Sequence, residues 1–155
     1  MTASTPALVA LERARIAFRV HAYEHDPSTS SYGQEAADRL RVDAQRVFKT
    51  LVVDVGGSPH VAVLPVHAEL DLRALGKRAA LAKAADAERV TGYVVGGVSP
   101  IGQRRRLPTL IDDSALAQDT IFVSAGRRGL EVELAPDDLI SVTGARVQRL
   151  TRSSE

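Results

Sequence analysis

The sequence predicts an α+β fold built around a mixed, partly closed β-sheet. Two apolar runs rich in β-branched residues, 48–55 and 60–66, flank the Gly-Gly-Ser-Pro segment 56–59 and form the clearest hairpin pattern in the chain. Expected helices and strands alternate irregularly, whereas a doubly wound parallel sheet requires stricter βα alternation. Because 45% of residues are apolar but only 4% aromatic, the core must consist mainly of Val, Leu, Ile and Ala.

The chain begins with a helix signal. Thr5 is a suitable N-cap and Pro6 suits the first helical position, and apolar residues follow at helical spacing up to Ile16. Residues 18–23 alternate apolar and polar side chains, with the period of a half-buried strand. Turn-forming residues and capping patterns then predict a loop at 25–30, a helix over 34–40 and a short helical turn that Asp43 caps and that ends near Val47.

The elements that follow the hairpin are short. We expect helices over 70–77 and 84–91, strands over 109–111, 120–124 and 130–134, and a last helix over 136–142 that Gly144 closes. Asp71 and Asp86 lie near the starts of two of these helices, where a carboxylate is favourable. Residues 125–129, Ala-Gly-Arg-Arg-Gly, predict the turn between the last two strands.

Length and composition indicate one cytoplasmic domain. A chain of 155 residues supplies one substantial core, so we expect a single domain over 1–155. The absence of cysteine excludes disulfides, thiolate metal sites and a cysteine nucleophile from the protein itself. The chain has no run of about 18 apolar residues and no apolar signal core, so we expect neither a membrane span nor secretion.

The most informative segment is the run 92–103, Gly-Tyr-Val-Val-Gly-Gly-Val-Ser-Pro-Ile-Gly-Gln. It opens with strand-like residues, turns on Gly96 and Gly97, and continues into the arginines 104–106. Glycine allows close approach of a backbone to a ligand because no Cβ intervenes, and arginine binds phosphate. We therefore expect a ligand here that carries phosphate, although a solvated surface also explains the arginines. A net charge of +1 is small for a protein that binds nucleic acid without a partner protein.

Few residue patterns suit catalysis. Lys49 stands at the head of the most apolar strand, where it either reaches solvent, the commoner arrangement, or enters a pocket as a cation for a carbonyl oxygen or a phosphate. The histidines lack metal-ligand spacing, and no serine lies in a Gly-x-Ser-x-Gly elbow. The glycine run matches neither a P-loop nor a dinucleotide motif. We expect no metal and no cofactor, and the groups that remain bind and polarise a substrate without supplying a nucleophile.

Five motifs in order resemble the YbaK/EbsC family over about 5–150, and above all its bacterial Cys-tRNA(Pro) deacylases. They are Tyr-Glu-His-Asp-Pro at 23–27, Phe-Lys-Thr-Leu-Val-Val at 48–53, Leu-Asp-Leu at 70–72, the run 91–103 and Arg-Gly-Leu-Glu-Val-Glu-Leu at 128–134. These proteins are relatives of the editing domain inserted in prolyl-tRNA synthetase. The resemblance implies a partly closed, barrel-like mixed sheet surrounded by helices, and hydrolysis of a mischarged tRNA.

The resemblance also implies roles for particular residues. Lys49 matches the family's central lysine, near the aminoacyl ester and the terminal adenosine, and Gly96 matches the position whose backbone lies beside the reacting carbonyl. The expected substrate pocket further contains Tyr23, Thr50, Gly97, Ser124 and Glu131. Glu131 stands where the best-known members have aspartate, which changes the reach of the carboxylate. Arg104, Arg105 and Arg106 are candidate contacts for the tRNA backbone.

The implied reaction removes cysteine from tRNA(Pro) that prolyl-tRNA synthetase has mischarged. In the family mechanism the substrate's own thiol attacks its ester carbonyl and leaves as a cyclic thiolactone, so a protein nucleophile is not required. In a transient complex, prolyl-tRNA synthetase would supply most of the affinity for tRNA. Two alternatives remain: a deacylase for Ala- or Ser-charged tRNA that activates water, and a non-catalytic module that binds aminoacyl-adenosine or a nucleotide.

Overall fold

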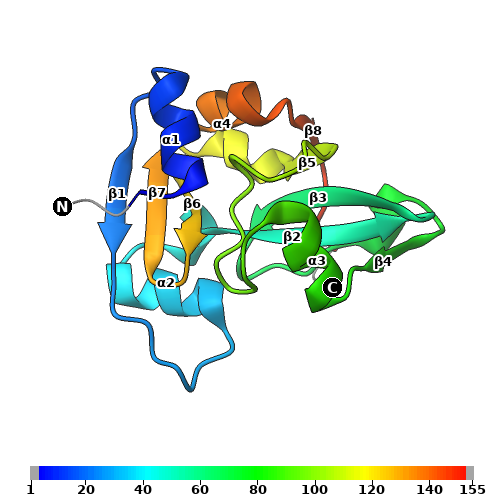
Figure 1. Ribbon diagram of the computed structural model, residues 1–155, viewed down its shortest axis with the longest axis horizontal. Helices are drawn as coiled ribbons and strands as arrows, with labels where there is room; N and C mark the ends of the chain where they lie inside the picture. Colours follow the sequence, from blue (N-terminus) through cyan, green and yellow to red (C-terminus); the bar gives the residue numbers. More distant parts are fainter. Residues whose placement is uncertain (1–3, 153–155) are drawn as a thin grey trace.

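Two β-sheets form the centre of the computed structural model, which describes residues 4–152 (Figure 1). The smaller sheet is antiparallel and has the order β1 (Arg19–Ala22), β7 (Leu130–Leu134) and β6 (Ile121–Arg127). The larger sheet has the order β4 (Ala79–Leu81), β2 (Phe48–Val55), β3 (Ser58–Pro65), β5 (Thr109–Asp112) and β8 (Arg146–Gln148). Its β2–β3 and β2–β4 pairs are antiparallel, whereas β3–β5 and β5–β8 are parallel.

The two sheets meet at a seam. Within residues 4–152 one isolated backbone bridge joins them, a parallel pairing of Val47, just before β2, with Phe122 on β6. The predicted α+β class with a mixed sheet is confirmed, and the sheets do not close into a barrel.

Four α-helices and three 3-10 turns surround the sheets in the described part of the chain. They are α1 (Pro6–Arg13), α2 (Tyr32–Leu40), α3 (Ala84–Thr91) and α4 (Pro136–Thr143), with the turns η1 (Ala44–Arg46), η2 (Leu72–Leu75) and η3 (Asp113–Ala117). Thr5 caps α1 as predicted: its hydroxyl accepts the Leu8 N–H at 3.2 Å and donates to the Ala125 carbonyl at 2.5 Å. The same hydroxyl therefore starts α1 and fastens it to β6. None of the helices in residues 4–152 is both long and apolar enough to cross a bilayer.

Several sequence-based expectations need correction. The expected helix over 70–77 is only the short turn η2, and the strands β4 and β8 and the turn η3 were not predicted. The strand-like opening of the glycine run forms no strand, because Gly92 adopts a φ of +82° and ends α3. Strand β6 continues to Arg127 through a bulge after Ser124, which shortens the expected turn.

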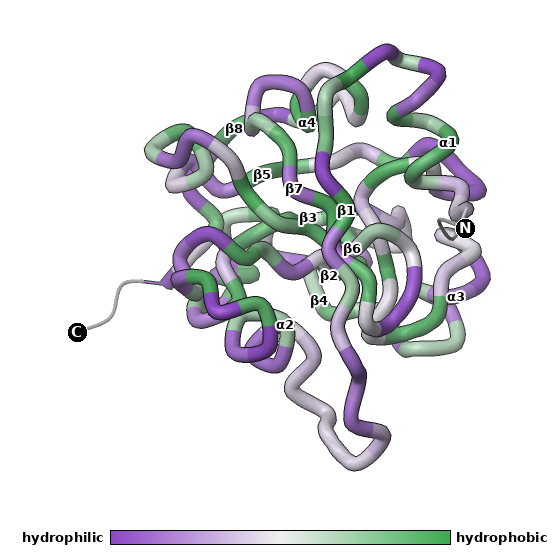
Figure 2. Tube along the Cα trace, turned by 90° about the vertical axis from the view of Figure 1, so that its left-hand side faces the viewer, coloured by the Kyte–Doolittle hydropathy of each residue, from purple (hydrophilic) through white to green (hydrophobic). Residues whose placement is uncertain are grey.

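The core lies between the sheets and beneath the helices. Its largest cluster links α1, both sheets and α4 through side chains at most 1% exposed, among them Leu11, Val61, Ile111, Val132 and Leu139. A second cluster covers the other face of the larger sheet, because alternate residues of β3 such as Ala62 and Leu64 point away from the first. Figure 2 shows apolar stretches in the middle of the molecule and a polar loop between β1 and α2 that projects from it.

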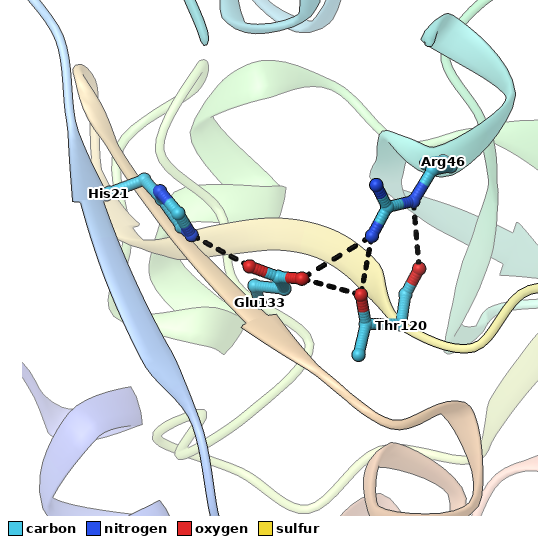
Figure 3. A network of polar contacts seen from close by, with 4 residues as sticks. All are labelled: His21, Arg46, Thr120 and Glu133. Atoms are coloured by element: carbon cyan, nitrogen blue, oxygen red, sulfur yellow. Dashed lines mark hydrogen bonds and ion pairs between the residues drawn. The ribbon is translucent and has the colours of Figure 1, made fainter. Parts of the chain in front are cut away.

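Figure 3 shows a polar network formed by the side chains of His21, Arg46, Thr120 and Glu133. The Glu133 carboxylate lies 2.9 Å from His21 Nε2 and 3.3 Å from Arg46, and it accepts a hydrogen bond from the Thr120 hydroxyl. The His21 ring and the Arg46 guanidinium each lie 5.1 Å from the Phe122 ring centroid. The network thus connects β1, β7 and η1 around the residue that bridges the two sheets. The hydrogen bonds from Thr120 and His21 lower the pKa of Glu133, because they favour its charged form.

We expect Glu133→Gln to lower the free energy of unfolding near pH 7 by about 1–3 kcal/mol, the usual effect of hydrogen bonds to a charged group. The pKa of Glu133 is lower in the folded than in the unfolded protein, so its contribution is complete above the ordinary value of 4.5 and is lost as pH falls through the folded pKa. Urea unfolding near pH 7 and at about pH 3 measures both effects. Glu12→Gln, at an exposed position of α1, is the matched control. A deficit in Glu133→Gln that does not shrink at low pH would contradict the assignment.

Candidate functional site

A cavity of about 560 Å³ opens between the two sheets. Strand β2 lines it from the larger sheet, and Ser124 of β6 and Glu131 of β7 line it from the smaller one. The N-terminal turns of α2 and α3 and the glycine loop at 95–98 complete the wall. Neither helix has a side-chain cap, so the N–H groups of its first turn lack a side-chain acceptor. The positive dipole ends of both helices lie beside the cavity. The cavity therefore favours ligand atoms that carry negative charge.

Lys49 lies in the wall of this cavity rather than free in solvent. The local sequence favoured the solvated position, and the structure corrects that interpretation. Its ammonium group donates a hydrogen bond to the Ala68 carbonyl at 2.7 Å, which holds the side chain in place. An ammonium group has three donors, so two remain for a ligand. Burial lowers the pKa of Lys49, an effect that nearby Glu69 partly offsets.

Thr50 supplies an unsatisfied polar atom to the same wall. Its hydroxyl oxygen is buried and has no hydrogen-bond partner in the described part of the chain. Buried polar atoms almost always have partners, and an exception in a cavity wall is a position where a ligand atom completes the bonding.

Tyr23 and Glu131 are two titratable groups in the cavity wall whose pKa values are raised. Glu131 is 7% exposed, and burial raises the pKa of its carboxyl group to about 8. Burial, reinforced by Glu131, raises the pKa of Tyr23 to about 12. Both groups therefore carry their protons at neutral pH and can act as hydrogen-bond donors. Ser124 pairs with Glu131 in the β6–β7 register, and its hydroxyl accepts the Gly126 N–H at 3.2 Å.

The glycine loop contributes backbone groups. Gly96 lines the cavity with a φ of +89°, a conformation that favours glycine. The N–H groups on either side are occupied, since Val95 donates to a Glu88 carboxylate oxygen at 2.8 Å and Gly97 donates to the Val94 carbonyl at 2.8 Å. The Gly96 N–H has no hydrogen-bond partner among residues 4–152. Val98 also lines the cavity and its N–H has no partner in the same residues, so the N–H groups of Gly96 and Val98 are the backbone donors of this loop that a ligand can use.

Sequence reasoning missed Tyr32, which lines the cavity at the start of α2. Its ring lies 5.7 Å from the His25 ring and 5.0 Å from the Arg128 guanidinium. His25 in turn contacts Glu35 at 2.7 Å. Burial opposes ionisation of Glu35, but hydrogen bonds from His25 and the Asp26 N–H outweigh it and lower the pKa. A tyrosine within a serine-rich loop, in a chain with few aromatic residues, was the available signal.

Four of the expected site residues lie outside the cavity wall. A Cβ on Gly97 would come within 2.7 Å of the Arg127 backbone, so this glycine serves close packing of two chain segments. Arg104, Arg105 and Arg106 are exposed and do not line the cavity. In contrast, Tyr23, Lys49, Thr50, Gly96, Ser124 and Glu131 come together around it.

Metal ligands are not part of this arrangement. Between residues 4 and 152 no group of three or more His, Asp or Glu side chains is placed to hold a metal ion. The cavity instead offers an ammonium group, hydroxyl groups, a neutral carboxyl group and a backbone N–H. These groups can bind a carbonyl oxygen and stabilise negative charge that develops on it.

Known proteins are similar to this chain in sequence and in fold. The aminoacyl-tRNA editing domain family matches residues 26–142. A relative from Enterococcus faecalis, described as "Putative Cys-tRNA(Pro)/Cys-tRNA(Cys) deacylase EbsC", is 40% identical over 125 residues, 76% of either chain. A solved structure described as "a putative trans-editing enzyme for prolyl tRNA synthetase" has a TM-score of 0.81 and 23% identity, covering 98% of this chain and 100% of that one. A hypothetical protein of known structure reaches a TM-score of 0.85 at 25% identity, covering 96% and 100%. The chain belongs to the aminoacyl-tRNA editing domain family.

Proposed function

We propose that this protein is a trans-editing deacylase that removes cysteine from mischarged tRNA(Pro). The observation that carries the proposal is a cavity with donors for a carbonyl oxygen but without an activated nucleophile. Among residues 4–152, none of the hydroxyl groups that line it forms a hydrogen bond with a histidine or carboxylate that could act as a base. A substrate that brings its own nucleophile suits such a site. Cysteine does so, and a 40% identical relative carries the name of a Cys-tRNA deacylase.

In the proposed reaction the cysteine thiol, as its thiolate, attacks the carbonyl carbon of its own ester. A carbon–sulfur bond forms, the ester carbon–oxygen bond breaks, and the proton from the thiol ends on the departing ribose oxygen of the tRNA. Free cysteine follows when water opens the thiolactone. Lys49 and the Gly96 N–H bind the carbonyl oxygen as it gains negative charge, while the uncharged Tyr23 and Glu131 side chains line the amino-acid end. Orientation of the thiol then supplies most of the acceleration.

We further propose that the exposed arginines 104–106 contact tRNA phosphates outside the cavity, in the cytoplasm, where tRNA is charged. The small net charge of +1 supports an additional partner that holds most of the tRNA. Prolyl-tRNA synthetase is the proposed partner, because it produces the mischarged substrate.

A side-by-side deacylation assay tests the function. We expect hydrolysis of Cys-tRNA(Pro), and little of Ala- or Ser-tRNA(Pro), because alanine has no nucleophile and a serine hydroxyl is a far weaker one. Acid-gel or radiolabel assays of the three substrates, with and without prolyl-tRNA synthetase, measure the rates. Activity confined to Ala- or Ser-tRNA would show a water-activating deacylase instead. Binding of aminoacyl-adenosine without turnover would show a non-catalytic module.

Lys49→Ala tests the cation. We expect the deacylation rate to fall by about 10²-fold, the scale for losing one donor to an oxyanion. Lys49→Arg should not restore the rate fully, since a planar guanidinium does not fit the place of an ammonium held by Ala68. Lys77→Ala removes an equal charge from an exposed position and serves as the control. Wild-type rates in Lys49→Ala would place the reaction elsewhere.

Gly96→Ala tests the glycine loop against a matched glycine. A Cβ on Gly96 would lie 2.7 Å from the Tyr32 ring and 2.9 Å from Arg128 Nε, whereas a Cβ on Gly57, which has a similar φ of +91°, meets nothing within 4 Å. We expect Gly57→Ala to lower the free energy of unfolding by about 1 kcal/mol through its positive φ alone, and Gly96→Ala to lower it by at least as much, because its Cβ must also displace Tyr32 or Arg128; urea unfolding measures both. Only Gly96→Ala should also lose activity, by about tenfold or more. Equal activity in the two variants would show that the glycine loop takes no part in the reaction.

A further inference from the structure

Val95 of the glycine loop is held by hydrogen bonds at both its carbonyl and its N–H group. The Val95 carbonyl accepts a hydrogen bond of 2.8 Å from Arg128 Nε, in the β6–β7 hairpin. The Val95 N–H donates to Glu88 of α3, also at 2.8 Å. Two elements far apart in the sequence therefore fix the backbone immediately before Gly96.

The bond from Arg128 acts directly on the donor that the reaction uses. The carbonyl of Val95 and the N–H of Gly96 belong to the same planar trans peptide, in which the two groups point in opposite directions. A side chain that holds the carbonyl therefore also sets the direction of the N–H. A charged donor on the carbonyl oxygen polarises the peptide as well, which makes its N–H a stronger donor.

Arg128 is itself held in place by the wall of the cavity. Its guanidinium carbon lies 5.0 Å from the Tyr32 ring centroid, in a cation–π contact. Glycine at position 96 leaves the space that this arrangement needs, since a Cβ there would approach both Tyr32 and Arg128 Nε within 3 Å. The guanidinium thus links three walls of the cavity: α2, the glycine loop and the β6–β7 hairpin.

We propose that Arg128 is a positioning residue for the deacylation: through the Val95 carbonyl it orients and polarises the Gly96 N–H toward the ester oxygen. This inference rests on the proposed function, because it assigns Arg128 to the same reaction. Arg128 touches no reacting atom in this scheme. It acts on the rate of the chemical step and leaves the grip on tRNA unchanged.

The experiment compares Arg128→Gln with Arg127→Gln, which removes the same charge from the adjacent exposed position. Single-turnover deacylation of Cys-tRNA(Pro) over a range of enzyme concentrations separates the maximal rate from the half-saturating concentration. We expect Arg128→Gln to lower the maximal rate about tenfold, the effect of losing one charge-assisted hydrogen bond, with half-saturation and its salt dependence unchanged. Arg127→Gln should match the wild type. Arg128→Lys, which retains a donor for the Val95 carbonyl, should recover part of the rate.

A readout without substrate keeps this inference separate from the proposed function. In ¹⁵N–¹H spectra of the free protein, Arg128→Gln should shift the Gly96 amide resonance, and Arg127→Gln should not. A Gly96 resonance unchanged in Arg128→Gln would overturn the inference whatever the substrate proves to be. So would an equal rise in half-saturation in both variants, which would make Arg128 a phosphate contact. A wild-type protein without activity on Cys-tRNA(Pro) would instead overturn the proposed function.

Discussion

The bridge between Val47 and Phe122 is the interaction on which the rest of the structure depends. It joins two sheets that otherwise pair only within themselves in the described residues. Helix α2 packs over it through Ala36 and Ala37, and the Glu133 network surrounds Phe122. Because the sheets meet here and separate beyond it, β2 and the β6–β7 hairpin form facing walls. The cavity is a consequence of how the two sheets are joined.

The chemistry of the cavity follows from burial without charge pairing. Among residues 4–152 Glu131 has no ion-pair partner that would stabilise its anion, so burial raises its pKa and favours the protonated carboxyl group. Lys49 keeps a backbone carbonyl rather than a carboxylate as its close partner. A lysine paired with a carboxylate would offer a ligand little net charge, whereas Lys49 keeps its positive charge available to a ligand. The uncapped ends of α2 and α3 add to the same positive potential.

Local patterns predicted much of the fold, and the reasons for the failures are physical. The hairpin of β2 and β3 and the caps at Thr5 and Asp43 depend on neighbouring residues, so they could be predicted from the sequence. Strands β4 and β8 have three residues each, too few to show a period, and they form only because a longer strand lies beside them.

The site could be predicted in part for the same reason. Lys49 was identifiable as a candidate, but the position of a lysine at a strand end does not show which way it faces. The contact of Tyr32 with Arg128 joins segments far apart in the sequence, and no pattern within either segment indicates it. Gly97 shares the motif of Gly96 yet packs against the Arg127 backbone, a distinction that appears only in three dimensions.

The hydrogen bond from Lys49 to the Ala68 carbonyl has a consequence for how this protein can vary. The lysine is placed by a main-chain atom, as the Gly96 N–H is placed through the main chain of Val95. A substitution at 68 or 95 retains the main-chain carbonyl that makes the hydrogen bond. The lengths of the two loops are constrained, because an inserted or deleted residue would displace the carbonyl group itself. Divergence in these loops should proceed by substitution far more readily than by insertion or deletion.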